Sequence, residues 1–274
     1  MPTCYIVGAG DFTPRGFAPV PGDLVLAADG GYRALYSLGY MPDLLLGDFD
    51  SLGDLPLPPD LPVLRFPARK DDTDTGLALR HGLDRGYRDF ALYGCAGGRV
   101  DHLLANLQSM ARVSRLGAAI RLAAPEYDAW ALTGPAPDTS APDTLEPHAS
   151  ASHASAPDAS ASHISASHAS APSTPASDAS APHISAPHTS GPAPHAPDGP
   201  AATLTLPDRP GGTLVSVFCH GDRAEGVTLT GLSYPLDGAD LTGDFPLGVS
   251  NRRLEGQPAT VSVRRGTLLI FQGA

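Results

Sequence analysis

Cysteine is scarce in this chain of 274 residues, which contains only Cys4, Cys95 and Cys219. The three are far apart, odd in number and form no CxxC pair, so the sequence excludes a disulfide framework and argues against structural zinc. We expect buried thiols in a reducing compartment.

Positive charge and long apolar runs are also lacking. The formal net charge is −11, whereas nucleic acids and acidic membranes attract basic patches, so we expect neither as a partner. No stretch approaches the roughly 18 apolar residues of a membrane span. The opening residues, MPTCYIVGAGDF, have neither the basic start nor the apolar length of a signal peptide, and we expect a cytoplasmic protein.

Residues 135–200 are almost entirely Ala, Ser, Pro, His, Thr and Asp, and from Ser150 they follow a five-residue repeat. Such a segment has almost nothing to bury and its prolines interrupt helices and strands, so we predict a disordered insertion between two domains. A His-rich tract can bind metal, but this spacing on a flexible chain fixes no coordination geometry. Low-complexity expansion is the simpler interpretation.

Residues 1–134 alternate strand-like and helix-like patterns. Near-continuous apolar runs of this kind indicate an α/β domain with a mainly parallel sheet. The predicted strands lie in the ranges 4–10, 23–30, 43–50, 62–68 and 89–98. The clearest helix begins near Arg99, and the spacing of its apolar residues predicts one buried face. That face consists of Val100, Leu103, Leu104, Leu107 and Met110.

Residues 201–274 contain strand patterns without a helical period, which predicts an all-β domain, a small sandwich or barrel. The segments TLVSVF and GVTLTGL read as strands, and AATLTLP reads as a further one. The segment ATVSVRRGTLLIF resembles a hairpin that turns at Arg265 and Gly266.

Polar clusters of the first domain follow its predicted strands. Asp29 follows LVLAA, Asp48 and Asp50 follow LLL, KDDTD follows VLRFPAR, and GGRVDH follows FALYGCA. A lone Asp at such a place is commonly a turn residue or a helix N-cap, and we expect Asp71 or Asp72 to cap the next helix. Parallel strands bring their carboxyl ends to one edge, where ligands bind, so the four segments together indicate one site.

Asp48 and Asp50, at the end of a predicted strand, should point the same way. Two such carboxylates repel each other unless they are well solvated or a cation lies between them. Hard oxygen ligands at a cleft are what Mg²⁺ takes when it is shared with the phosphates of a nucleotide. The pair therefore suggests a cation site.

Cationic residues complete the pattern. Lys70 is the only lysine of the chain, and we expect it to face phosphate. Arg99, His102 and Asn106 are spaced to share one helix face. The glycines before them permit close backbone approach to a phosphate, and a helix N-terminus favours negative charge. The glycines of GAGDF, near the N-terminus, are a weaker signal of the same kind.

Six motifs in order resemble the thiamine pyrophosphokinase family. They are ADGG (28–31), GDFDS (47–51), KDDTD (70–74), GGRVDH with Asn106, GVTLTGLSYPL (226–236) and GVSN (248–251). The resemblance implies an α/β catalytic domain (1–134) followed by a β-sandwich (201–274), in a homodimer that binds thiamine between subunits. It also implies that ATP and thiamine give AMP and thiamine diphosphate.

The resemblance also implies residue roles. Asp48, Asp50 and Asp74, with Asp29 or Asp71, would hold Mg²⁺ on ATP. Lys70 and Arg99 would offset developing charge, and Asp101 would orient or deprotonate the thiamine hydroxyl. Further ATP contacts would come from Gly30, Thr73, His102 and Asn106, and thiamine contacts from Ser51, Tyr234, Ser250 and Asn251.

Several alternatives stay open at this point. Tyr234 is suited to stack on the flat thiamine cation, and the alternative is a core tyrosine on an alternating strand. Another alcohol, such as a hydroxymethyl pterin, would suit the same acidic site, and a non-catalytic nucleotide-binding module is a different class. Gly76 departs from the family pattern, and within a helix it costs about 1 kcal/mol relative to Ala.

Overall fold

The computed structural model describes residues 1–49, 52, 55–66, 72–135 and 200–274, all of which belong to one compact unit. The predictions made for residues 136–199 lie outside the described residues. In the part of the chain that the structure describes, no helix is long and apolar enough to cross a membrane.

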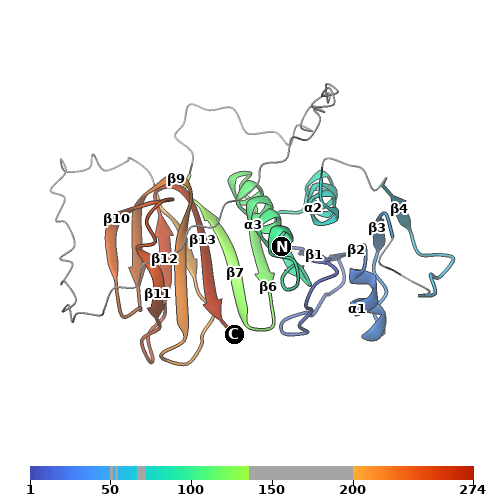
Figure 1. Cartoon of the computed structure of the whole chain (residues 1–274), viewed down its shortest axis with the longest axis horizontal. Helices are drawn as coiled ribbons and strands as arrows, with labels where there is room; N and C mark the ends of the chain where they lie inside the picture. Colours follow the sequence, from blue (N-terminus) through green and yellow to red (C-terminus); the bar gives the residue numbers. More distant parts are fainter. Residues whose placement is uncertain (50–51, 53–54, 67–71, 136–199) are drawn as a thin grey trace, which may run out of the picture. The chain divides into compact units, whose positions relative to one another are not determined.

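The N-terminal half is built on a parallel sheet, as predicted (Figure 1). Its strand order is β4-β3-β2-β1-β5-β6, and every neighbouring pair is parallel. The strands are β1 (Cys4–Val7), β2 (Leu24–Ala28), β3 (Leu44–Gly47), β4 (Val63–Arg65), β5 (Asp89–Tyr93) and β6 (Ala119–Ala123). Residues of β1, β2 and β3 are buried throughout, which explains their uninterrupted apolar sequences.

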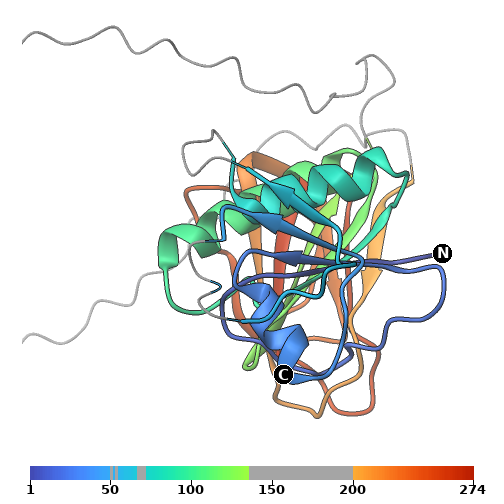
Figure 2. The same cartoon turned by 90° about the vertical axis from the view of Figure 1, so that its right-hand side faces the viewer.

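Three helices cover the two faces of this sheet, and Figure 2 shows α1 on one side of the strands and the other two helices opposite. They are α1 (Gly31–Ser37), α2 (Asp74–Asp84) and α3 (Val100–Arg115). One core cluster joins Leu79 of α2 and Met110 of α3 to the sheet, and a second joins Tyr32 and Leu35 of α1 to its opposite face.

The predicted buried face of α3 is partly wrong. Val100 is 69% exposed and Leu104 is 56% exposed. The helix packs on β6 and two later strands through its later turns, so its first turns leave apolar side chains uncovered. The buried face begins at Asn106 and consists of Asn106, Leu107, Met110, Ala111, Val113 and Ser114.

The C-terminal half consists of antiparallel strands, which confirms the predicted change to an all-β pattern. The strands are β8 (Ala202–Thr205), β9 (Leu214–Thr230), β10 (Leu236–Thr242), β11 (Gly248–Arg252), β12 (Thr260–Val263) and β13 (Arg265–Gly273). The two segments read as separate strands are parts of the long β9, which pairs with β10, β11, β12 and β13. Side chains of these strands form one sandwich core, which includes Val217 and Leu229 of β9, Val261 of β12 and Ile270 of β13.

The predicted hairpin at Arg265 and Gly266 is wrong. β12 pairs with β8 and β9, whereas β13 pairs with β9 and β7 (Tyr127–Thr133), so the two consecutive strands are not partners. Gly266 has φ +89, and a Cβ there would lie 2.5 Å from the carbonyl oxygen of Arg223. The glycine therefore permits close approach to β9 where the chain changes partner, and it does not turn a hairpin.

Strand β7 connects the two halves. β7 pairs antiparallel with β6 on one side and with β13 on the other, so the sheet continues from one half into the next. The strand patterns of β6 and β7 were not among the predicted ones.

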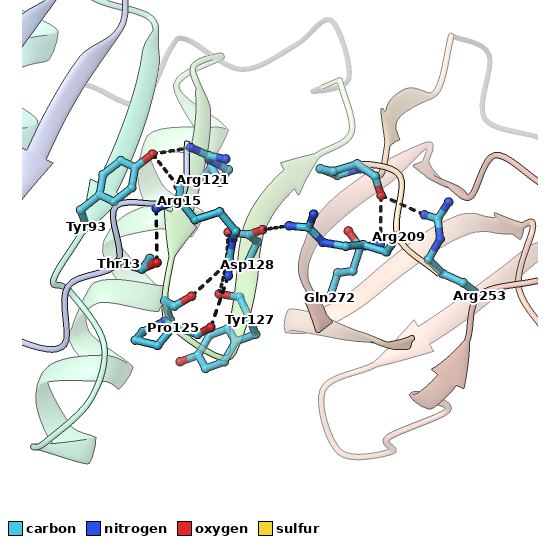
Figure 3. A network of polar contacts seen from close by, with 12 residues as sticks. Thr13, Arg15, Tyr93, Arg121, Pro125, Tyr127, Asp128, Arg209, Arg253 and Gln272 are labelled. Carbon is cyan, nitrogen blue, oxygen red and sulfur yellow. Dashed lines mark hydrogen bonds and ion pairs between the residues drawn. The ribbon is translucent and has the colours of Figure 1, made fainter. Parts of the chain in front are cut away.

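Asp128 of β7 reinforces this connection (Figure 3). Its side chain is almost fully buried. The carboxylate accepts hydrogen bonds from Nη2 of Arg15 at 3.0 Å and from Nη2 of Arg209 at 3.2 Å. Arg15 belongs to the loop after β1, and Arg209 lies between β8 and β9. One buried carboxylate thus holds segments from both halves.

Candidate functional site

The strand order places the topological switch point of the parallel sheet between β1 and β5. From β1 the chain proceeds outward through β2, β3 and β4, and then returns to the other side of β1 to form β5 and β6. Ligands of open α/β sheets bind beside the carboxyl ends of strands at such a point. The segments that follow β2, β3, β4 and β5, which carry the predicted polar clusters, all start from this one edge.

The loops after β1 and β5 pack directly on each other. Gly10 N–H donates to the carbonyl oxygen of Gly94 at 2.7 Å, and Asp11 N–H donates to that of Ala96 at 2.8 Å. A Cβ on Gly10 would lie 2.3 Å from the Ala96 carbonyl oxygen. The glycines of GAGDF are therefore explained by contact between two loops at the switch point.

The side chain of Asn106, on α3, holds the loop after β5. Its amide Nδ2 donates to the carbonyl oxygen of Cys95 at 2.8 Å, and the side chain is buried. Arg99 and His102, predicted to share a helix face with it, are exposed. The structure therefore gives Asn106 a role in holding the loop, and its predicted contact with ATP stays a prediction.

The turns after β2 and β3 are coupled. Asp29 and Phe49 are non-glycine residues in the left-handed region, with φ +48 and +69, and Phe49 N–H donates to Oδ1 of Asp29 at 3.1 Å. β3 ends at Gly47, directly before Asp48. Asp50 lies outside the described residues, so the predicted alignment of its carboxylate with that of Asp48 stays a prediction.

The glycines of ADGG have separate positions. Gly30 is the N-cap residue of α1, and Gly31 is its first residue. A Cβ on Gly31 would lie 1.8 Å from the carbonyl oxygen of Val7 in β1, so only glycine fits there. The motif thus brings the start of α1 against the end of the central strand.

Arg65 is a cation at this edge that motif reasoning missed. It is paired in register with Gly47 at the end of β4, and its guanidinium carbon lies 4.6 Å from the ring centroid of Phe49. Applying the strand-end criterion to VLRFPA as well as to the acidic clusters would have identified it.

The N-terminus of α2 carries part of KDDTD. Thr73 is the N-cap, with its hydroxyl accepting from Gly76 N–H at 3.0 Å, so the expected Asp71 or Asp72 cap is wrong. Asp72 accepts from Thr73 N–H at 2.9 Å and pairs with Arg80 at 2.9 Å. Asp74 lies in the first turn, where the helix dipole favours a carboxylate.

The N-terminus of α3 carries an exposed ion pair. Nε of Arg99 lies 3.1 Å from Oδ1 of Asp101. The hydrogen bond from Arg99 holds the pKa of Asp101 below its ordinary value. In this pair Asp101 is a weaker base than an isolated carboxylate, and its predicted role toward the thiamine hydroxyl stays a prediction.

Four predicted site residues, Asp50, Ser51, Lys70 and Asp71, lie outside the described residues. Within the described ranges, no three His, Cys, Asp or Glu side chains gather into a group that could hold a metal ion. The acidic donors that remain at this edge are carboxylates, which are hard oxygen ligands of the type that Mg²⁺ takes.

The sandwich presents the second group of predicted residues. Tyr234 is 72% exposed, which excludes the alternative of a core tyrosine. Ser250, on β11, is exposed with φ +61, whereas Asn251 is 3% exposed. Asn251 hydrogen-bonds to the main chain of Tyr234, so the structure brings these two residues together.

Together these features define a class: a two-part protein in which an α/β sheet has its polar edge at a topological switch point and an antiparallel sandwich follows. Comparison with known families is consistent with both parts. Residues 21–122 match the model of the thiamin pyrophosphokinase catalytic domain, and residues 202–268 match that of the thiamin pyrophosphokinase vitamin B1 binding domain. The two matches together cover more than half of the chain. The chain belongs to the thiamine pyrophosphokinase family.

Individual relatives agree. The thiamine pyrophosphokinase of Bacillus subtilis (strain 168) is 33% identical over 103 residues, which are 36% of this chain and 48% of that protein. The alignment thus spans about half the length of that curated relative. The crystal structure of the thiamine pyrophosphokinase from Bacillus subtilis superposes with a TM-score of 0.66 at 20% identity, covering 99% of each chain.

A more distant relative has the same fold. The thiamin pyrophosphokinase from Candida albicans superposes with a TM-score of 0.61 at 10% identity, covering 100% of this chain and 89% of that one. At these identities the structural likenesses establish the fold, an α/β parallel part followed by antiparallel strands.

Proposed function

We propose that this chain transfers the pyrophosphoryl group of ATP to the hydroxyl of thiamine, forming thiamine diphosphate and AMP. The observation that carries the proposal is the presence, in one chain, of matches to both the catalytic and the vitamin B1 binding models of one family. The polar edge at the switch point supports it, because phosphate esters bind at such edges.

In this reaction the hydroxyl oxygen of thiamine forms a bond to the β-phosphorus of ATP. The bond from that phosphorus to the oxygen bridging to the α-phosphate breaks, AMP leaves, and the hydroxyl loses its proton. Catalysis of this kind depends largely on alignment and on neutralising charge. Arg99, exposed at the start of α3, and Lys70 would offset the charge on the phosphates, and Asp101 would orient the hydroxyl.

Mg²⁺ would be held by Asp48, Asp50 and Asp74, with Asp29 or Asp71 as a further ligand. Bound there, the ion would neutralise the triphosphate and draw electron density from phosphorus. The coupled turns that carry Asp29 and Asp48 support this assignment, because the contact between Asp29 and Phe49 fixes the spacing of the two acidic segments.

Thiamine would bind at the sandwich through Tyr234 and Ser250, with Ser51 contributing from the α/β half. We propose a homodimer in which one subunit supplies the acidic edge and its partner supplies the sandwich surface. We further propose that the protein works in the cytoplasm, where ATP is available.

The decisive experiment incubates the purified protein with ATP and Mg²⁺ and either thiamine or a hydroxymethyl pterin. We expect AMP and thiamine diphosphate with thiamine, no AMP with the pterin, and no product when EDTA removes Mg²⁺. AMP formed with the pterin alone would identify another alcohol as substrate, and ADP as the product would mean a different transfer. The dimer is tested separately by sedimentation velocity.

A further inference from the structure

The side chain of Asn251 hydrogen-bonds to both main-chain polar groups of Tyr234. Its Oδ1 accepts from Tyr234 N–H at 2.9 Å, and its Nδ2 donates to the Tyr234 carbonyl oxygen at 2.7 Å. Oδ1 also accepts from Arg252 N–H at 2.9 Å. Both acceptor sites of the carboxamide oxygen are thereby used within the protein.

Local backbone geometry turns Asn251 inward. The register of β11 against β9 shifts between Gly248 and Asn251, and Ser250 within this irregularity adopts φ +61. Ser250 N–H donates to Oγ of Ser216 at 3.1 Å, which anchors the unusual conformation to β9. A bulge re-aims the side chain that follows it, and here the result is a carboxamide that is 3% exposed.

The segment that carries Tyr234 is constrained from other directions as well. Ser233 N–H donates to the carbonyl oxygen of Arg252 at 2.8 Å. Pro235 follows Tyr234, and a residue before proline is restricted to extended conformations. A tyrosine that is 72% exposed therefore stands on a backbone fixed on both sides.

We infer that Asn251 is a positioning residue, which acts on the ligand through Tyr234 and does not contact it through its carboxamide oxygen. Rigid support lowers the ordering cost of placing the tyrosine ring against a flat cationic heteroaromatic ring. This inference rests on the proposed function, since it assigns the thiamine surface of the same site. It replaces direct recognition by Asn251 with preorganisation of Tyr234.

A double-mutant cycle on the full-length protein tests it. The variants are Asn251→Ala, Tyr234→Leu and the two combined, and isothermal titration calorimetry measures the Kd for thiamine of each. Asn251→Ala should weaken thiamine binding by about tenfold, the cost of ordering one side chain. In the Tyr234→Leu background the same change should have almost no effect, and the Kd for ATP should be unchanged throughout.

An equal loss in both backgrounds would overturn the inference, because it would mean that Asn251 contacts the ligand itself. If Asn251→Ala does not fold, as judged by thermal unfolding, Asn251→Asp takes its place in the cycle. That variant keeps an acceptor for Tyr234 N–H, but it replaces the donor to the Tyr234 carbonyl by a carboxylate oxygen and adds a negative charge there. Failure of the unaltered protein to bind thiamine would refute the proposed function, whereas binding with additive effects refutes only the positioning role.

Discussion

Phe49 N–H donates to Oδ1 of Asp29, so the turn after β3 is held by the side chain that ends β2. Both residues occupy the left-handed region, which Asp and Asn tolerate better than other non-glycine residues. The contact connects backbone conformation at two neighbouring strand ends to the carboxylates that these ends carry.

Substitutions at Asp29 should separate its structural role from its charge. Asp29→Asn keeps an acceptor for Phe49 N–H and tolerates the left-handed backbone, so stability should change little while turnover falls with the loss of charge. Asp29→Ala loses the acceptor for Phe49 N–H and the tolerance of the left-handed backbone, and we expect about 2 kcal/mol of destabilisation. Urea unfolding and AMP release measure the two effects, and equal stabilities of both variants would contradict the structural role.

Gly76→Ala should destabilise the protein although alanine is the better helix former. A Cβ at this position would lie 2.1 Å from Oδ1 of Asp72, which accepts from Thr73 N–H and pairs with Arg80. The new methyl group must displace that carboxylate. We therefore expect a lower denaturation midpoint for Gly76→Ala.

The matched control is Gly76→Ala made in an Asp72→Ala background. With the carboxylate removed, the helix propensity of alanine should dominate and the substitution should stabilise by up to about 1 kcal/mol. A gain in stability in the unaltered background would show that the close approach is relieved at no cost.

The extent of prediction from sequence differs between the two halves. The parallel strands were predictable because strands buried on both faces leave uninterrupted apolar runs such as YIV and LLL. The expected Asp71 or Asp72 cap of α2 was wrong because Asp is on average a better N-cap residue than Thr, whereas here Asp72 pairs with Arg80 and Thr73 caps the helix.

The errors in the sandwich have a different cause. Gly266 gave the signal of a turn, but its conformation serves close approach to β9, and local sequence does not distinguish the two uses of glycine. The role of Asn251 depends on an irregular strand register, which residue periodicity cannot reveal.

Buried thiols predict a loss of stability in alkali. Burial raises the pKa of Cys4 to about 12 and that of Cys95 to about 11, from an ordinary value of 9.0. In the unfolded chain both ionise near pH 9, so stability should be unaffected below that pH and fall as pH rises from about 9 to 12. Burial also raises the pKa of Tyr5 and Tyr93, which adds to the same trend.

Urea unfolding curves recorded at closely spaced pH values from about 8 to about 10.5 measure this dependence of stability on pH. Cys4→Ala should lower the starting stability but also reduce the alkaline slope, by at most about 1.4 kcal/mol per pH unit. An unchanged slope would mean that Cys4 does not stay protonated in the folded protein. In the native state at pH 8, iodoacetamide should modify the half-buried Cys219 before the two buried thiols.

Asp128→Asn should destabilise the fold strongly. The change leaves Arg15 and Arg209 facing a neutral amide at a position that is 1% exposed. Removing one partner from a fully buried ion pair costs roughly 3 kcal/mol, and we expect up to this amount because the Arg15 and Arg209 side chains stay 30% and 24% exposed. The control is Asp240→Asn, which removes an exposed pair with Arg223 and should leave the denaturation midpoint almost unchanged. Equal midpoints for both variants would refute a central role for Asp128.

Deleting residues 140–198 should leave folding and turnover nearly unchanged. Among the described residues, the pairing of β7 with β13 and the contact of Asp128 with Arg209 join the two halves without that segment. The described residues on either side of it are attached to neighbouring positions of the chain. Gly134 N–H donates to the carbonyl oxygen of Gly266, and Ala202 is paired with Val263. In the deletion variant, residues 135–139 and 199–201 would connect the end of β7 to the start of β8. Every one of these residues can span at most roughly 3.5 Å, which is enough for this connection. A lower unfolding midpoint or a loss of AMP formation in the deletion variant would show that the insertion contributes contacts of its own.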